Sequence, residues 1–187
     1  MMNETLIRAT VFAAHKHRHQ RRKMADAIPY INHPLDLIHI LAIEAKIADI
    51  NVLCGAVLHD TIEDTDTEYD DIEKLFGPKI ADIVAEVTDD KTLPKAARKQ
   101  AQIEKAPHAS PEAKLVKLAD KIANMRDMAA NPPSGWEIAR IIDYIAWSKE
   151  VVDRMRGAHE VLEKLFDAAY ETARAAHQGA KPLGLLE

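Results

Sequence analysis

The sequence of 187 residues contains one cysteine, six glycines and only 5% aromatic residues. A single cysteine excludes an intramolecular disulfide framework and is typical of a reducing compartment. Cys54 lies within the apolar run 52–58, where we expect a small core residue rather than a nucleophile. No apolar run reaches the ~18 residues of a membrane span, and residues 1–5 lack the basic and apolar pattern of a signal peptide. These absences predict a cytoplasmic protein with no membrane contact.

The scarcity of glycine also bears on the fold class. Ala, Leu and Ile dominate the 47% apolar fraction, and no run of alternating β-branched residues is present. This composition favours helices, and the length fits one core. We predict an all-α, compact, single-domain helical fold over residues 1–187, with 179–187 as a flexible tail. The net charge of −5 argues against a nucleic-acid partner.

Capping residues and proline divide the chain into helices. The expected helices cover about residues 4–19, 32–46, 50–60, 68–76, 78–89, 111–126, 135–152 and 158–177, and the basic segment 91–105 is expected to be part loop and part helix. The signals that open them are Asn32 with Pro34, Asp49, a capping box of Thr67 and Asp70, Pro78 after Gly77, Ser110, and a capping box of Ser134 and Glu137.

The apolar run 52–58 leads directly into a cluster of four chemically active side chains. His59 and Asp60 are followed by Glu63 and Asp64. Residues four apart share a helix face, so His59 would lie over Glu63 and Asp60 over Asp64 if the helix continues. Ionised carboxylates next to an apolar helix need a partner or water. The natural partner for this cluster is a divalent metal ion.

Two adjacent residues cannot complete a metal site, so ligands are needed from other helices. His33 lies at a predicted helix start, and Asp120 lies among apolar residues of another helix. The predicted ligands are therefore His33, His59, Asp60 and Asp120, with positions left open for water and substrate. Taken singly, His33 also fits a capping or surface role, and Asp120 fits a salt bridge to Lys117 or Lys121. The remaining histidines are expected to be surface or packing residues.

Basic residues gather in two segments of this acidic chain. The first holds Lys16, Arg18, Arg21, Arg22 and Lys23, and the second holds Lys91, Lys95, Arg98 and Lys99. A solvated helix face is the simple explanation of such runs. A cationic rim beside a metal would instead receive a small phosphorylated ligand, because Arg and Lys both match phosphate oxygens. Glu63 or Asp64 could then exchange a proton with water or the leaving oxygen, which is the chemistry of phosphoester hydrolysis.

Several motifs together resemble the HD-domain phosphohydrolases, and among them the small alarmone hydrolases of the RelA/SpoT family. They are HRHQRRK (17–23), PYINHP (29–34), LHDTIEDT (58–65), EVTDDKTLP (86–94) and KLVKLADKIANMR (114–126). The resemblance covers nearly the whole chain. It implies one Mn²⁺ per chain on the four predicted ligands, and Glu63 and Asp64 as the catalytic pair. The implied reaction removes the 3′-pyrophosphate from (p)ppGpp, giving GDP or GTP and pyrophosphate.

The resemblance also implies the nucleotide contacts. Arg22 and Lys23 would meet the nucleotide, Asn124 would contact the ribose or phosphates, and Tyr30 would form a wall of the pocket. This chain departs from the long bifunctional members, which continue into a synthetase, and its loop 24–28 lacks the glycine-rich character of the family. Two alternatives stay open: hydrolysis of another phosphorylated nucleotide such as NADPH, and a sensor module that binds alarmone without turnover. Oligomeric state is not predicted.

Overall fold

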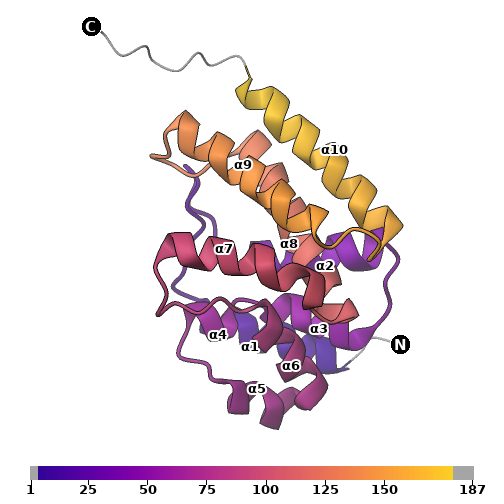
Figure 1. The fold of residues 1–187 in the computed structure, drawn as a ribbon. Coiled ribbons are helices and arrows are strands. Elements are labelled where there is room, and N and C mark those ends of the chain that lie inside the picture. The colour runs from indigo at the N-terminus through magenta and orange to yellow at the C-terminus, as the bar shows by residue number, and fades with distance from the viewer. Residues whose placement is uncertain (1–3, 179–187) are drawn as a thin grey trace, which may run out of the picture.

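The computed structural model describes residues 4–178, which form a helical array (Figure 1). In chain order the segments are α1 (Glu4–Lys16), α2 (Asn32–Ile38), the π-helix η1 (His39–Glu44), α3 (Ile50–Leu58), α4 (Thr61–Asp64), α5 (Tyr69–Phe76), α6 (Pro78–Val87), α7 (Lys95–Lys105), the 3₁₀ turn η2 (Ala106–His108), α8 (Pro111–Ala130), α9 (Ile138–Asp153) and α10 (Glu160–His177). The all-α prediction is confirmed, because strand-type pairing in the described chain is limited to an isolated bridge between Arg21 and Pro29.

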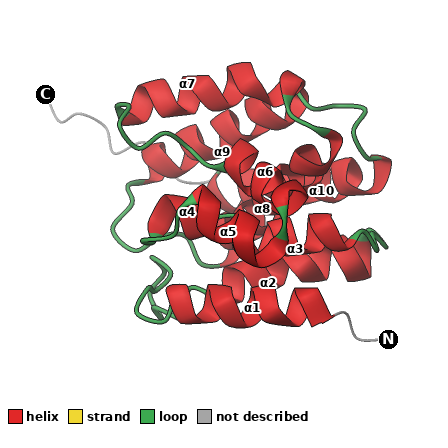
Figure 2. Cartoon of the chain, turned by 90° about the horizontal axis from the view of Figure 1, so that it is seen from below, coloured by secondary structure: helices red, strands yellow, loops and turns green. Residues whose placement is uncertain are grey.

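Helices α3 and α8 occupy the interior of the array. Residues 52–58 of α3 are all buried, and α1, α2, α6 and α8 pack around that helix. A helix that is apolar on every side needs neighbours on every side, which explains its central place. In Figure 2 α3 and α8 lie inside the array, with α1 along one edge and α7 along the opposite edge. Helix α8 packs in turn against α10, α9, α6 and α2.

The predicted tail at 179–187 lies outside the described residues. Within residues 4–178, no helix combines the length and the apolar character required to span a bilayer.

Helices α3 and α6 approach each other closely at Gly55. A Cβ atom placed on Gly55 would lie 2.6 Å from Cγ2 of Ile83, far inside van der Waals contact. Ile83 is only 1% exposed, so its side chain has little room to move away. Glycine is therefore required at this position by the helix spacing, although it lowers intrinsic helix stability.

Several predicted helix boundaries are confirmed by the hydrogen bonds at the caps. The side chains of Asp49 and Ser110 accept hydrogen bonds from backbone N–H groups in the first turns of α3 and α8, at 2.8 and 3.2 Å. Gly77 has a φ of +90° between α5 and α6, and Pro78 opens α6. These signals act through local geometry alone, which is why the sequence reveals them.

Three other predicted starts are wrong. The residue before α2 is Ile31, in a helical backbone conformation without a side-chain cap, so Asn32 is inside the helix. The capping box of α5 is formed by Glu68 and Asp71, one residue after the predicted pair. Thr67 is instead buried, and its hydroxyl bonds that of Thr65 at 2.8 Å. A buried tertiary position therefore overrides the local signal.

The third wrong start is the capping box of Ser134 and Glu137 predicted for α9. The helix predicted over 32–46 also differs in form. Glu137 precedes α9 without a side-chain cap. The backbone N–H of Ser134 donates to the carbonyl of Lys23 at 2.6 Å, which ties two loops together instead. The second half of the helix expected over 32–46 is the π-helix η1. Neither feature has a recognisable local sequence signal.

The close approach of α3 and α6 predicts whether alanine at position 55 raises or lowers the free energy of unfolding. Helix propensity alone would make Gly55→Ala stabilising by about 0.5–1 kcal/mol. Overpacking against Ile83 costs about 1–3 kcal/mol, so we expect a lower free energy of unfolding, measured by urea denaturation. In an Ile83→Ala background the clash is absent, and the same change should become neutral or stabilising. Stabilisation of the wild-type background would contradict the close approach.

Candidate metal and nucleotide site

One cavity of about 490 Å³ gathers the residues singled out from the sequence. All ten predicted site residues line it: His33, His59, Asp60, Asp120, Glu63, Asp64, Arg22, Lys23, Tyr30 and Asn124. They come from α2, α4, α8, the turn after α3 and the loop after α1. The fold thus brings together residues that lie up to about a hundred positions apart in the chain.

The HD motif lies at a break between two helices. Helix α3 ends at Leu58 and α4 begins at Thr61, so the helix expected through residue 60 stops two residues earlier. The carbonyl of Asp60 still makes a helix-type hydrogen bond, which it accepts from the N–H of Asp64 at 2.9 Å. The hydroxyl of buried Thr61 donates to the carbonyl of Leu58 at 2.7 Å and holds the break in place. The break turns the motif toward the cavity.

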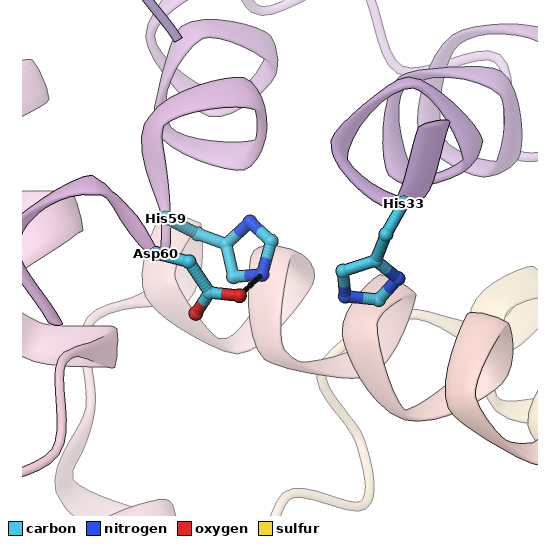
Figure 3. A group of neighbouring side chains, drawn as sticks. All are labelled: His33, His59 and Asp60. Atoms are coloured by element: carbon cyan, nitrogen blue, oxygen red, sulfur yellow. Dashed lines mark ion pairs between the residues drawn. The ribbon is translucent and has the colours of Figure 1, made fainter. Parts of the chain in front are cut away.

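Three of the four predicted metal ligands converge on one point. The ligand atoms of His33, His59 and Asp60 all lie within 4.8 Å of one another. Figure 3 shows the two imidazoles reaching toward the same space from separate helices, with the Asp60 carboxylate beside them. Nε2 of His59 lies 3.0 Å from Oδ2 of Asp60. This arrangement can hold a metal ion.

The tautomer of His59 fits a ligand role. Its Nδ1 lies 2.8 Å from the carbonyl of Ala56, so Nδ1 carries a hydrogen and Nε2, which faces Asp60, is the nitrogen that could bind a metal after losing its proton. Within the described chain, the buried Nδ1 of His33 has no hydrogen-bond partner. Burial acts to lower the pKa of His59, but the charges of Asp60 and Asp120 outweigh burial and raise that pKa to about 9. Negative charge therefore surrounds the ring.

Asp120 lies beside His33, but it is not one of the three residues whose ligand atoms all lie within 4.8 Å of one another. Its Oδ1 is 3.2 Å from Nε2 of His33 and accepts from the side-chain amide of Asn124 at 2.6 Å. Its Oδ2 lies 3.5 Å from the ammonium of Lys121. The sequence left open whether Asp120 binds a metal or forms a salt bridge. In the structure one of its oxygens faces His33, a predicted metal ligand, and the other faces Lys121.

The acidic pair that follows the motif is held in two different ways. One oxygen of Glu63, Oε2, accepts from the backbone N–H of Asp89 at 3.1 Å. Burial, and then the charge of Asp60, raise the pKa of Glu63 above its ordinary value. Both oxygens of Asp64 are occupied, Oδ2 by the amide of Gln20 at 2.8 Å and Oδ1 by the ammonium of Lys91. Glu63 thus has one oxygen without a donor in the described chain, whereas both oxygens of Asp64 have one.

Arg22, one of the residues predicted to contact a nucleotide, is held by several neighbouring side chains. The guanidinium of Arg22 donates to Asp127 and lies 3.4 Å from Oδ1 of Asn124. It also lies over the ring of Tyr30, 5.8 Å from the centroid. The hydroxyl of Tyr30 donates to Asp60, and burial raises the pKa of that hydroxyl far above its ordinary value. Tyr30 therefore connects Arg22 to Asp60.

Several lining residues were missed by the sequence reasoning. They are Gln20, Asp127 and Lys121, together with the aromatic wall of Trp136, Tyr144 and Trp147. One signal was available: positions 120, 124 and 127 share a face of a helix, and all three are polar. The aromatic wall carries no such signal, because its rings come from a loop and a helix far along the chain.

The chain is similar in sequence to a known protein family and to several known proteins. A family model described as the HD domain matches residues 9–145. A mouse protein named guanosine-3′,5′-bis(diphosphate) 3′-pyrophosphohydrolase MESH1 is 52% identical over 166 residues, which is 89% of this chain and 93% of that relative. The human protein of that name is 53% identical over 159 residues, 85% of this chain and 89% of the relative.

A solved structure gives the same result at the level of the fold. It is described as "A metazoan ortholog of SpoT hydrolyzes ppGpp and plays a role in starvation responses", and it superposes with a TM-score of 0.89. Sequence identity to it is 46%, over 91% of this chain and 96% of that chain. The extent of the family match and the identity to these relatives show that the chain belongs to the HD-domain family.

Proposed function

We propose that this chain is a Mn²⁺-dependent hydrolase that converts (p)ppGpp and water into GDP or GTP and pyrophosphate. The observation that carries the proposal is a cavity of about 490 Å³ that holds a His-Asp group, a carboxylate with a raised pKa and an arginine fixed by Asp127. The relatives named as ppGpp pyrophosphohydrolases support the substrate. We further infer that residues 1–187 act as one hydrolase domain and that it works in the cytoplasm, where its nucleotide substrate would be found.

His33, His59 and Asp60 would hold the metal ion, with Asp120 as the fourth ligand. Two imidazoles and two carboxylates suit borderline to hard cations such as Mn²⁺. The convergence of the ligand atoms of His33, His59 and Asp60 within 4.8 Å of one another supports this assignment, because a cation there would meet two imidazoles and a carboxylate together. When bound, a divalent cation supplies charge that polarises a phosphoryl oxygen and lowers the pKa of water.

The protein side chains then divide the work of hydrolysis. Glu63 accepts a proton from the attacking water, because its pKa is raised and its Oε1 has no hydrogen bond within the described chain. The water oxygen bonds to the phosphorus next to the ribose, and the bond from that phosphorus to the 3′ oxygen breaks. The 3′ oxygen takes up a proton from solvent to become the 3′-hydroxyl of GDP or GTP, pyrophosphate departs, and Glu63 returns its proton to solvent. Asp64, tied at both oxygens, supplies fixed negative charge beside Glu63.

Arg22 would bind the nucleotide rather than the reacting phosphorus. Asp127 and Asn124 fix its guanidinium on one side, and the Tyr30 ring supports it on another. A guanidinium fixed in this way keeps its remaining donors and its flat face in one orientation for a base or a phosphate. Lys23 is exposed at the rim of the same cavity and can add a point charge.

The first prediction for this function is turnover itself. Purified protein with Mn²⁺ and ppGpp should release pyrophosphate, and a Glu63→Gln variant should lose about 10²–10⁴-fold in kcat while binding ppGpp with similar affinity. Pyrophosphate release and calorimetric titration measure the two quantities. Binding without turnover by the wild type would favour the sensor alternative.

The same assay distinguishes the substrates. ppGpp, pppGpp and NADPH are compared at equal concentration with Mn²⁺, following pyrophosphate for the first two and orthophosphate for NADPH. We expect the two alarmones to be turned over faster. A higher kcat/KM with NADPH would replace the proposed substrate and leave the metal and acid assignments standing.

Metal content tests the ligand set. After dialysis against Mn²⁺, mass spectrometry of the wild type should find one ion per chain, and His59→Ala and Asp120→Ala should each fall far below that value. The matched control is His39→Ala, because His39 is exposed and outside the cavity. Full Mn²⁺ retention by the Asp120 variant would remove Asp120 from the ligands and leave it as the partner of His33.

The role of Arg22 predicts a change in KM. Loss of a charged hydrogen-bonding group costs about 1.5–3 kcal/mol, so Arg22→Ala should raise KM roughly tenfold or more. Its effect on kcat should be small, because the contact is present in both the ground and the transition state. Arg18→Ala is the control, since Arg18 is exposed and does not line the cavity. An unchanged KM would place Arg22 away from the nucleotide.

A further inference from the structure

Asp64 depends on groups outside its own helix for its orientation. It is the last residue of α4, a helix of four residues, and the next residue has an extended backbone. So short a helix has little cooperative stability of its own. The carboxylate is instead held from the loop after α1, where the amide of Gln20 donates to Oδ2 at 2.8 Å. The ammonium of Lys91 contacts the other oxygen.

The amide of Gln20 can satisfy this contact in only one orientation. Its Nε2 must face Asp64, because an amide oxygen turned toward a carboxylate would be repelled. The other end of the amide, Oε1, then lies 2.6 Å from Nδ1 of His17. An oxygen at that distance needs a donor, so His17 must carry its hydrogen on Nδ1. The three side chains form a directed chain from His17 through Gln20 to Asp64.

His17 is built into the fold in a way that suits this role. It is 3% exposed, and its ring lies 4.9 Å from the ring of Tyr30, the residue that donates to Asp60. Burial lowers the pKa of His17 despite the opposing effects of Gln20, Asp60 and Asp64. A neutral ring with hydrogen on Nδ1 leaves Nε2 as a bare acceptor, and that atom has no hydrogen-bond partner in the described chain.

We propose that Gln20 is a positioning residue that aims Asp64 into the cavity, and that His17 fixes the orientation of the Gln20 amide. The inference rests on the proposed function, since it concerns how one member of the acidic pair is held. A merely structural alternative would have Gln20 tie the loop after α1 to α4 without affecting the chemistry. The two differ in whether the effect of Gln20 passes through Asp64.

A double-mutant comparison separates these alternatives. Gln20→Leu should lower kcat for ppGpp by about 10–100-fold, the usual effect of removing a group that orients an active-site residue, with KM within about twofold and Mn²⁺ content unchanged. In an Asp64→Asn background the same change should have no further effect on kcat. His19→Ala is the control, because His19 is exposed and two residues from His17. A further tenfold loss in the Asp64→Asn background would overturn the proposal.

Two substitutions at His17 separate its hydrogen bond from its ring. Asn places a donor where Nδ1 lies but removes the ring, whereas Phe keeps a ring against Tyr30 and removes the donor. We expect His17→Asn to keep kcat within about threefold and His17→Phe to fall as far as Gln20→Leu. Thermal unfolding of each variant shows whether it remains folded at the assay temperature. The opposite order of activity would overturn the role assigned to His17.

A spectroscopic measurement tests the network without turnover. Long-range ¹H–¹⁵N spectra of the wild-type chain should show His17 as the neutral Nδ1–H form, and Asp64→Asn should shift the side-chain amide signal of Gln20. Hydrogen on Nε2 of His17, or an unmoved Gln20 signal, would overturn the inference even if a variant fails to fold. Absence of ppGpp turnover by the wild type overturns the proposed function alone. An active wild type with an unaffected Gln20→Leu overturns only this inference.

Discussion

Two buried imidazoles facing each other are the constraint on which this site depends. The ring centroids of His33 and His59 lie 5.2 Å apart in an edge-on arrangement, and Nδ1 of His33 has no hydrogen-bond partner in the described chain. A buried polar atom in that condition costs about 1–3 kcal/mol. Apolar packing of α3 supplies the stability that holds such an arrangement, because its residues 52–58 are all buried. The core therefore supports a pair of rings that would be better stabilised by a bound cation.

The part of this fold that local chemistry determines could be predicted from the sequence. Caps such as Asp49 and Ser110, and the Gly77 turn, each act within one helical turn, so their residues alone identify them. The start predicted at Thr67 failed because that side chain is buried, which depends on packing from outside the segment. Tertiary packing decides such positions, and a single sequence contains no direct record of it.

The candidate site divides in the same way. All ten predicted residues line one cavity, because the motif residues must meet for any of the chemistry to occur. What the sequence could not give is how each is held. The partner of Arg22 is Asp127, and one partner of Asp64 is Gln20; both are common polar residues whose meaning depends on which loop reaches which helix. Local patterns therefore singled out residues that line one cavity, and the structure supplies their connections.

The two acids that follow the motif differ because their surroundings differ. Glu63 has one oxygen held by a backbone N–H and lies where burial raises its pKa, so it can take up a proton. Asp64 has both oxygens in contact with donors, one of them the cationic Lys91. The two carboxylates therefore differ in how many of their oxygens are held by donors. Sequence alone treats the pair as equivalent, whereas the fold gives them different surroundings.

Helix α8 connects the predicted metal ligands of the cavity to Arg22, the predicted nucleotide contact. Asp120 contacts His33 at one end of a polar face, and Asp127 holds Arg22 seven residues further on. At 1.5 Å per residue that interval is about 10 Å. Asn124 lies between them, donating to Asp120 and accepting from Arg22, so neither end can shift without disturbing the other. Under the proposed function, a rigid spacing of this kind would select ligands by length. A nucleotide whose phosphate reached the metal group while its base or sugar met Arg22 would satisfy both ends, and inorganic pyrophosphate would satisfy only one.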